Sequence, residues 1–201
     1  GYPVINSSDR QLYIGNREPK LNFGFMNKLN YKSLSLSFLW DFRIGGDVYN
    51  ATRIGMISNG IAEDIGEWRD REFVFNGVVE QGDGTYRKNT KTVVLDYNYF
   101  TTNYTAVGTN FVEKVNWARL RYVTFNYSLP SHITERLRVG KIQLEASAQN
   151  PLLFTNYSGG DPEVNSAGPN AGGAEGGSTM GVDFGAIPLA RSYSFGISVG
   201  F

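Results

Sequence analysis

Large apolar and small residues alternate along the end of the chain. From Tyr193 to Phe201 (YSFGISVGF), one parity carries the large apolar side chains and the other carries serine and glycine. A period of two is typical of a β-strand with two different faces. A soluble sheet edge this apolar would recruit further strands or aggregate, whereas a closed membrane barrel has no free edge and places one face in lipid. The pattern therefore predicts a membrane-spanning strand.

The same period of two recurs in four earlier segments. Together with the last one, the expected strands cover about residues 19–29, 34–44, 117–129, 141–149 and 187–201. Their lengths suit a tilted strand, which needs about nine to eleven residues to cross a bilayer. The expected fold class is therefore all-β: five antiparallel strands of a transmembrane β-barrel.

The connections between these strands alternate in length. Short links join the first strand to the second and the third to the fourth, whereas the other two connections, residues 45–116 and 150–186, are long. Outer-membrane barrels have short periplasmic turns and long extracellular loops, so both long loops are expected outside the cell. Single-chain barrels have at least about eight strands. Residues 1–201 are therefore expected to form the C-terminal part of one larger barrel domain.

In most of these strands, the charged and polar residues occupy every second position and so lie on one face. The residues expected to face lipid are Phe23, Phe25, Leu36, Phe38, Phe125, Leu144, Phe195 and Ile197. Those expected to face the lumen are Lys28, Arg43, Glu145, Gln149 and Ser194. Near the extracellular end of the third strand, Arg119 and Arg121 are expected to pair with loop carboxylates or lipid headgroups rather than with substrate.

Composition is compatible with this fold and excludes other classes. Because there is no run of about 18 apolar residues, no transmembrane helix is expected. Lys and Arg number 19 and Asp and Glu number 19, so no electrostatic reason exists to expect nucleic acid as a partner. The first residues have neither the basic start nor the apolar centre of a signal peptide. Since a barrel protein must be exported, the chain is expected to be a piece of a longer precursor.

Residues with catalytic or metal-binding chemistry are few. His132, the only histidine, lies in an expected short turn, where a Ser-His-Asp triad is not indicated. Asp161 and Glu163 in GGDPEVN could ligate calcium, or they could belong to a proline-containing turn without metal. The glycines between Gly168 and Gly181 lack the lysine and hydroxyl of a phosphate-binding loop. We therefore expect no enzyme activity, no metal and no cofactor.

The first long loop carries the main candidates for binding. Residues 51–58 are expected to form a short helix, and many aromatic residues follow it. The candidates for substrate or partner binding are Trp68, Tyr86, Tyr97 and Tyr99. Aromatic rings stack on sugars and also anchor protein partners, and the sequence does not choose between the two. The alternative is that these rings pack the loop against itself.

Five segments, taken in order, resemble the C-terminal end of SusC/RagA-type TonB-dependent transporters of Bacteroidetes outer membranes. They are IGNREP (Ile14–Pro19), LSFLWDFRIGGDVYN (Leu36–Asn50), VNWARLRYVTFNYSLP (Val115–Pro130), AQNPLLFTNYSGGDPE (Ala148–Glu163) and GVDFGAIPLARSYSFGISVGF (Gly181–Phe201). Single pieces are common, but five in the same order and spacing are specific. The resemblance covers nearly the whole chain.

The resemblance implies a barrel of about 22 strands with an N-terminal plug, located in the cell outer membrane and energised by TonB. It also implies a SusD-like surface lipoprotein as a lid, and import of oligosaccharides or peptides. The plug and the earlier strands would lie upstream of this chain, so contact with TonB would run through that missing part. Similarity to outer-membrane proteins further implies that the terminal strand, ending at Phe201, is an assembly signal read by the barrel-assembly machinery.

Two other classes of protein remain open at this point. One is a soluble, secreted all-β carbohydrate-binding domain, in which the apolar residues of each strand would face a shared core. The other is a barrel adhesin without transport. A soluble domain would fold and stay in solution alone, whereas a barrel would require detergent.

Overall fold

The computed structural model describes residues 1–4, 14–163 and 181–201. Most of the glycine-rich run that was compared with a phosphate-binding loop lies outside these residues. The chain divides into two compact units. The loop unit contains the described residues of 1–15, 48–113 and 181–185, and the sheet unit contains 16–47, 114–163 and 186–201. Each unit is described by itself.

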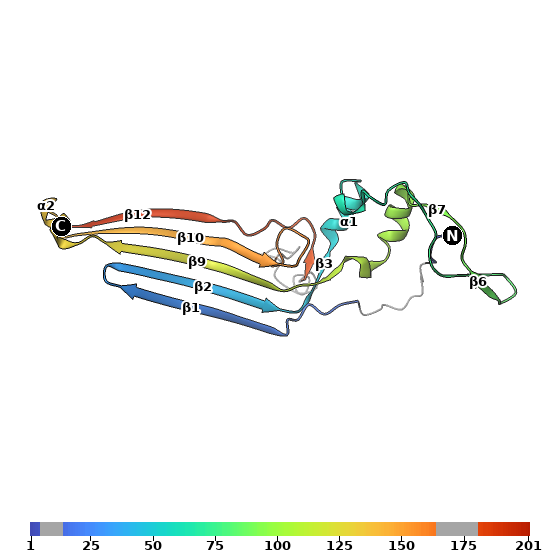
Figure 1. The fold of residues 1–201 in the computed structure, drawn as a ribbon, viewed down its shortest axis with the longest axis horizontal. Helices are drawn as coiled ribbons and strands as arrows, with labels where there is room; N and C mark the ends of the chain where they lie inside the picture. The colour runs from blue at the N-terminus through green and yellow to red at the C-terminus, as the bar shows by residue number, and fades with distance from the viewer. Residues whose placement is uncertain (5–13, 164–180) are drawn as a thin grey trace, which may run out of the picture. The chain divides into compact units, whose positions relative to one another are not determined.

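The sheet unit is a single antiparallel sheet in the order β1-β2-β9-β10-β12 (Figure 1). Its strands are β1 (Leu21–Tyr31), β2 (Leu34–Ile44), β9 (Trp117–Ser128), β10 (Lys141–Thr155) and β12 (Ser192–Gly200). The turn between β1 and β2 holds Lys32 at a φ of 51°. The short link between β9 and β10 contains α2 (Ser131–Arg136). In the described part of the chain, β1 and β12 each pair on one side only.

Strand β1 lies two residues later than the expected 19–29, and the largest differences in extent from the sequence-based expectation are in β10 and β12. β10 continues to Thr155, whereas the expected strand stopped at residue 149. Pro151 is tolerated because the register of β10 against β9 is irregular between Gln149 and Leu152, so its missing N–H removes no regular ladder bond. The second long connection therefore begins after residue 155. The final strand begins at Ser192, later than the expected residue 187.

The two faces of the sheet differ in chemistry, as two neighbouring cross-strand rows show. One row runs Leu29, Leu36, Phe125, Ala146, Phe195 across the five strands. The next position along the strands gives the row Lys28, Ser37, Thr124, Ser147, Ser194. We call these the apolar face and the polar face. Residues 23, 25, 38, 144 and 197 also belong to the apolar face by register, which is the grouping that the period of two predicts.

A β-bulge interrupts the alternation in β9. Leu39 pairs with Tyr122, but the next residue of β2, Trp40, pairs with Leu120, so Arg121 is an extra residue in β9. Residues after the bulge follow the expected parity, with Val123 on the apolar face. Before the bulge the parity is reversed, because Asp41 pairs directly with Arg119 on the polar face.

The loop unit is built from short elements around its own core. These are most of β3 (Asp47–Asn50), α1 (Ala51–Ser58), η1 (Glu63–Ile65), β4 (Glu72–Phe73), β5 (Val78–Glu80), β6 (Tyr86–Lys88), β7 (Val93–Val94), η2 (Tyr99–Tyr104), η3 (Gly108–Phe111), most of β8 (Val112–Lys114) and β11 (Val182–Asp183). The core cluster is Ile57, Ala62, Ile65, Leu95, Phe100 and Phe111. The expected helix at 51–58 is confirmed by α1. No helix in the described ranges is long and apolar enough to cross a membrane.

Candidate functional site

Helix α1 provides one wall of a pocket in the loop unit. The side chain of Asn50 accepts a hydrogen bond from the backbone N–H of Arg53 at 3.0 Å and so caps the helix. Ile57 then points into the buried core, where it is 1% exposed. The cap and the buried face fix the rotation of the helix, which directs Arg53 toward η1 and η2.

Aromatic side chains form most of this pocket, which has a volume of about 270 Å³. Its lining is Arg53, Asp64, Ile65, Trp68, Phe73, Phe75, Leu95, Tyr99, Phe100 and Tyr104. We call it the aromatic pocket. The rings support one another: Phe73 meets Trp68 edge-on at 6.4 Å and Phe75 at 4.9 Å between centroids. A cavity of this size accepts one ring or one side chain, since the pockets that bind drug-sized ligands measure about 300–1,000 Å³.

The two charged residues of the aromatic pocket form an ion pair. Nε of Arg53 donates to Oδ2 of Asp64 at 2.7 Å, and its NH2 group also bonds this carboxylate. The guanidinium lies over the rings of Tyr104 and Phe111, at 5.9 and 5.5 Å from their centroids. Within the described residues, Oδ1 of Asp64 accepts no hydrogen bond. The pocket is therefore charge-balanced and retains one carboxylate oxygen as an acceptor.

The ionisation states of the pocket follow from these contacts. Burial alone would lower the pKa of Arg53, but hydrogen bonds to Tyr104 and Asp64 outweigh it, so the pKa lies above its usual value. The pKa of Tyr99 is also raised, first by burial and then by the neighbouring phenols of Tyr104 and Tyr2. Arg53 is thus a permanent cation and Tyr99 a neutral hydroxyl at physiological pH.

The structure separates the four aromatic candidates into two groups. Trp68 and Tyr99 line the aromatic pocket, and Trp68 remains 49% exposed. Tyr86, on β6, and Tyr97 are exposed at 64% and 62% and do not line it. Several other rings of this loop, including Phe100, pack it against itself, as the alternative interpretation held.

The two charged residues that line the pocket, Arg53 and Asp64, were not among the candidates. Their eleven-residue separation gives no signal in the sequence, because η1 brings them together only once the loop has folded. An arginine on the expected helix and a run of acids after it were the available hints.

A second cluster of charges lies on the polar face of the sheet unit. Arg119, whose side chain is 3% exposed, donates from NH2 to Asp161 at 2.6 Å, and its Nε lies 2.5 Å from Glu163. Arg121 bonds both Asp41 at 2.7 Å and Glu163 at 2.6 Å, and its guanidinium lies over the ring of Trp117. We call this the arginine–carboxylate cluster. It confirms the expectation that these arginines pair with loop carboxylates.

The carboxylates of this cluster serve as hydrogen-bond acceptors for protein groups. Asp161 also accepts from the backbone N–H groups of Glu163 and Leu189, at 3.0 and 3.2 Å. This pattern fits the turn interpretation of Asp-Pro-Glu rather than the calcium interpretation. In the described part of the chain, no three His, Cys, Asp or Glu residues form a group that could hold a metal ion. His132 lies on α2.

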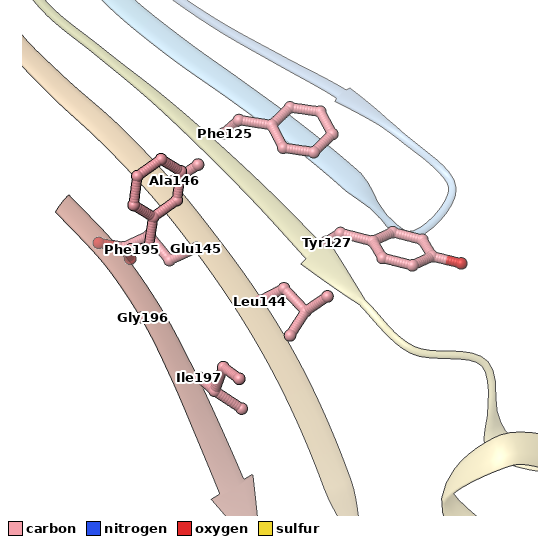
Figure 2. Close-up of a pocket in the computed structure, with 8 residues that line it drawn as sticks. All are labelled: Phe125, Tyr127, Leu144, Glu145, Ala146, Phe195, Gly196 and Ile197. Atoms are coloured by element: carbon pink, nitrogen blue, oxygen red, sulfur yellow. The ribbon is translucent and has the colours of Figure 1, made fainter. Parts of the chain in front are cut away.

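The apolar face contains a shallow hollow of about 350 Å³ (Figure 2). Its lining comes from β9, β10 and β12 and comprises Phe125, Tyr127, Leu144, Glu145, Ala146, Phe195, Gly196 and Ile197. The hollow exists because Ala146 is the one small side chain in the row between Phe125 and Phe195. We call it the Ala146 hollow.

In the described residues, the sheet has one apolar face, one polar face and two outer strands that each pair on one side only, which are features that a segment of a membrane-barrel wall requires. Comparison with known proteins agrees. The chain is 26% identical over 204 residues to TonB-dependent receptor P3 of Formosa agariphila, covering 100% of this chain and 18% of the receptor. It is also 26% identical over 197 residues to TonB-dependent receptor P26 of the same organism, covering 98% and 18%.

Among solved structures, the chain is similar to the RagAB peptide importer in its closed-closed state. The match has a TM-score of 0.58 and 20% identity, and covers 92% of this chain and 17% of that one. No family model matches. The chain spans less than a fifth of the length of these relatives. It is homologous to one segment of the TonB-dependent receptors, which are outer-membrane β-barrels rather than enzymes, and its fold is that of the corresponding part of such a barrel.

Proposed function

We propose that the chain forms the last five strands of a SusC/RagA-type importer of about 22 strands. The observation that carries this proposal is the sheet with unpaired β1 and β12 edges in a homologue of TonB-dependent receptors. Both edges need partners, and upstream strands of the same protein would supply them. The plug, and through it the contact with TonB, would also belong to that upstream part.

The polar face would line the lumen and the apolar face would meet lipid. This assignment is supported by the exposure of Phe195 and Ile197, which are 86% and 73% exposed in the sheet unit. A charge placed on a lipid-facing strand near the middle of the membrane costs about 2–4 kcal/mol, which accounts for the absence of charged residues from the apolar rows described above. The short links would then lie on the periplasmic side.

The imported substrate would be an oligosaccharide or a peptide, delivered under a SusD-like lipoprotein lid. The similar solved structure is described as a peptide importer, which supports import as the activity. The loop unit would contribute to the extracellular opening, since it is formed largely by the first long connection.

The aromatic pocket is the part of the loop unit we assign to substrate or lid binding. Trp68 is half exposed above a wall of Phe73, Phe75 and Tyr99. Among the described residues, Oδ1 of Asp64 accepts no hydrogen bond and so can accept one from a ligand. A large exposed ring beside a free acceptor suits either a sugar ring or an inserted side chain of a partner.

Substituting Trp68 by alanine should weaken binding of the lid or the substrate by about tenfold or more, since removing an anchoring ring costs about 2 kcal/mol. The measurements are titration of the purified receptor with its lid and with substrate, and uptake by cells. Tyr86→Ala and Tyr97→Ala are matched controls, because both rings are exposed outside the pocket. Unchanged lid binding and unchanged uptake in Trp68→Ala would remove the pocket from the proposal.

Of the other two classes of protein, the soluble domain is less consistent with the sheet unit. A soluble carbohydrate-binding domain would bury its apolar face in a core, yet Phe195 is 86% exposed and lies next to the free β12 edge. A barrel adhesin would have the same sheet, so the two classes must be separated by measuring nutrient uptake. Deletion of TonB should abolish uptake through an importer, whereas an adhesin supports no TonB-dependent uptake.

A further inference from the structure

We propose that the Ala146 hollow, together with the basic link at the nearby ends of β9 and β10, binds an anionic glycerophospholipid. One acyl chain would lie in the hollow between Phe125 and Phe195, and the phosphate would pair with cations of the link. The membrane location follows from the homology, and the choice of leaflet rests on the proposed orientation of the barrel.

The hollow has the shape and chemistry of an acyl-chain site. Phe125 and Phe195 flank Ala146 in one cross-strand row, and Tyr127, Leu144 and Ile197 form the next row (Figure 2). The hollow has a volume of about 350 Å³, is open on one side and is lined almost entirely by apolar side chains. The apolar face of an outer-membrane sheet meets lipid. An acyl chain that fills the hollow covers its apolar lining and leaves neither water nor an empty space there.

The link between β9 and β10 has the composition of a segment at the membrane interface. Residues 131–141 carry Arg136, Arg138 and Lys141 against the single acid Glu135. Leu137 is 59% exposed among these cations. Exposed apolar residues beside cations favour a position at the headgroup level, and the cations favour an anionic lipid.

The depth of the hollow matches one leaflet. Five residues separate Lys141 from Ala146, which is about 17 Å along a strand at about 3.3 Å per residue. A tilt of about 40° reduces this to about 13 Å of depth, whereas half of the hydrocarbon core is about 15 Å. An acyl chain that begins at the link can therefore reach the hollow without leaving its leaflet.

On the proposed orientation, the link lies at the periplasmic surface. The periplasmic leaflet of the outer membrane consists of glycerophospholipids, whereas lipopolysaccharide occupies the outer leaflet. The chemistry of the site therefore selects a glycerophospholipid with an anionic headgroup, such as phosphatidylglycerol.

The test is retention of phosphatidylglycerol by the full-length receptor in detergent, measured by native mass spectrometry. Ala146→Leu fills the hollow and should reduce the retained lipid at least fivefold. Ala148→Leu is the matched control, because Ala148 lies on the same strand and face but does not line the hollow. Ala146→Val is a smaller filling change for use if the leucine variant does not fold.

A second variant set tests the headgroup. Replacing Arg136, Arg138 and Lys141 by serine should reduce retention of phosphatidylglycerol at least threefold and leave diacylglycerol with the same chains unaffected. Full retention in both Ala146 variants would overturn the proposal. If the Ala146 variants lose phosphatidylglycerol but the serine substitutions do not, the proposed contact between the phosphate and the link is wrong. If the molecule held at the hollow is lipopolysaccharide, the assignment to the periplasmic leaflet is wrong.

Discussion

Replacing Arg119 by methionine should destabilise the folded receptor by about 3–5 kcal/mol. Arg119 and Asp161 have side chains that are 3% and 2% exposed, and their hydrogen bond is 2.6 Å long. Among the described residues, removing the arginine leaves the buried Asp161 carboxylate with the backbone N–H groups of Glu163 and Leu189 as its donors. The change in unfolding free energy can be measured by urea titration of the receptor in detergent micelles.

Asp161→Asn combined with Arg119→Met should recover part of this loss, because the double variant leaves no uncompensated charge between the two sites. Arg17→Met provides the exposed control: its ion pair with Glu18 is largely solvated and should be worth no more than about 1 kcal/mol. A loss below about 1 kcal/mol in Arg119→Met would show that the cluster does not hold the connection after β10 to the sheet.

Deleting Phe201 should remove most of the folded receptor from the outer membrane while leaving the unfolding midpoint of the remaining receptor nearly unchanged. The residue follows β12 directly and is fully exposed in the sheet unit, so it contributes little packing there. An aromatic residue that follows β12 and packs against little of the described sheet unit is a candidate for recognition during assembly, which we assign to the barrel-assembly machinery. The amount of heat-modifiable receptor in outer-membrane fractions measures this directly.

Two variants separate recognition of Phe201 from simple packing. Phe201→Tyr keeps an aromatic ring at the terminus and should preserve the membrane level. Val199→Ala removes apolar surface from β12 without altering the terminus, and should do the same. Normal membrane levels after the deletion would show that Phe201 is only an interfacial residue.

The sequence was sufficient to locate the five long strands of the sheet unit and the helix of the first long loop. The period of two in residues 34–44 identified β2 with its observed bounds, because a sheet with two different faces requires alternation at every position. The helix at 51–58 was recognisable from its local composition between strand-like segments. Both are local properties, which is why one sequence was enough.

The β-bulge in β9 was not expected, although the sequence contains a trace of it. Strict alternation along β9 would place Arg119 and Arg121 on the same face as Val123 and Phe125. That face would then carry both charged and apolar side chains. The extra residue in β9 resolves the conflict by reversing the parity before Tyr122. A change of chemistry within one parity is therefore the signal that could have located the bulge.

The β-bulge also determines the face on which Trp117 lies. An aromatic residue at the end of a membrane strand is ordinarily expected at the lipid interface. In the sheet unit, Trp117 is instead 8% exposed and covered by the guanidinium of Arg121, on the polar face. The position of Trp117 on the polar face is revealed by its pairing with Arg43 of β2. This pairing depends on the register of the two strands rather than on their composition.

The aromatic pocket was predictable only in part. Aromatic abundance pointed to Trp68 and Tyr99, but the same argument included Tyr86 and Tyr97, which lie outside it. Short irregular elements such as η1 and η2 bring Arg53 and Asp64 together with the aromatic rings of the pocket. Such elements have no periodic signal, so the residues they bring together cannot be read from spacing.

The central claim is that the sheet is a membrane wall whose apolar face meets lipid and whose polar face meets water. Spin labels at Phe38 and Ser37 test it most directly, because these neighbours lie on opposite faces of β2 and pair with Val123 and Thr124 of β9. In the reconstituted receptor, the label at residue 38 should be relaxed by oxygen, which dissolves in lipid, and the label at residue 37 by a water-soluble nickel complex. Equal accessibility of the two labels to both reagents would contradict the account.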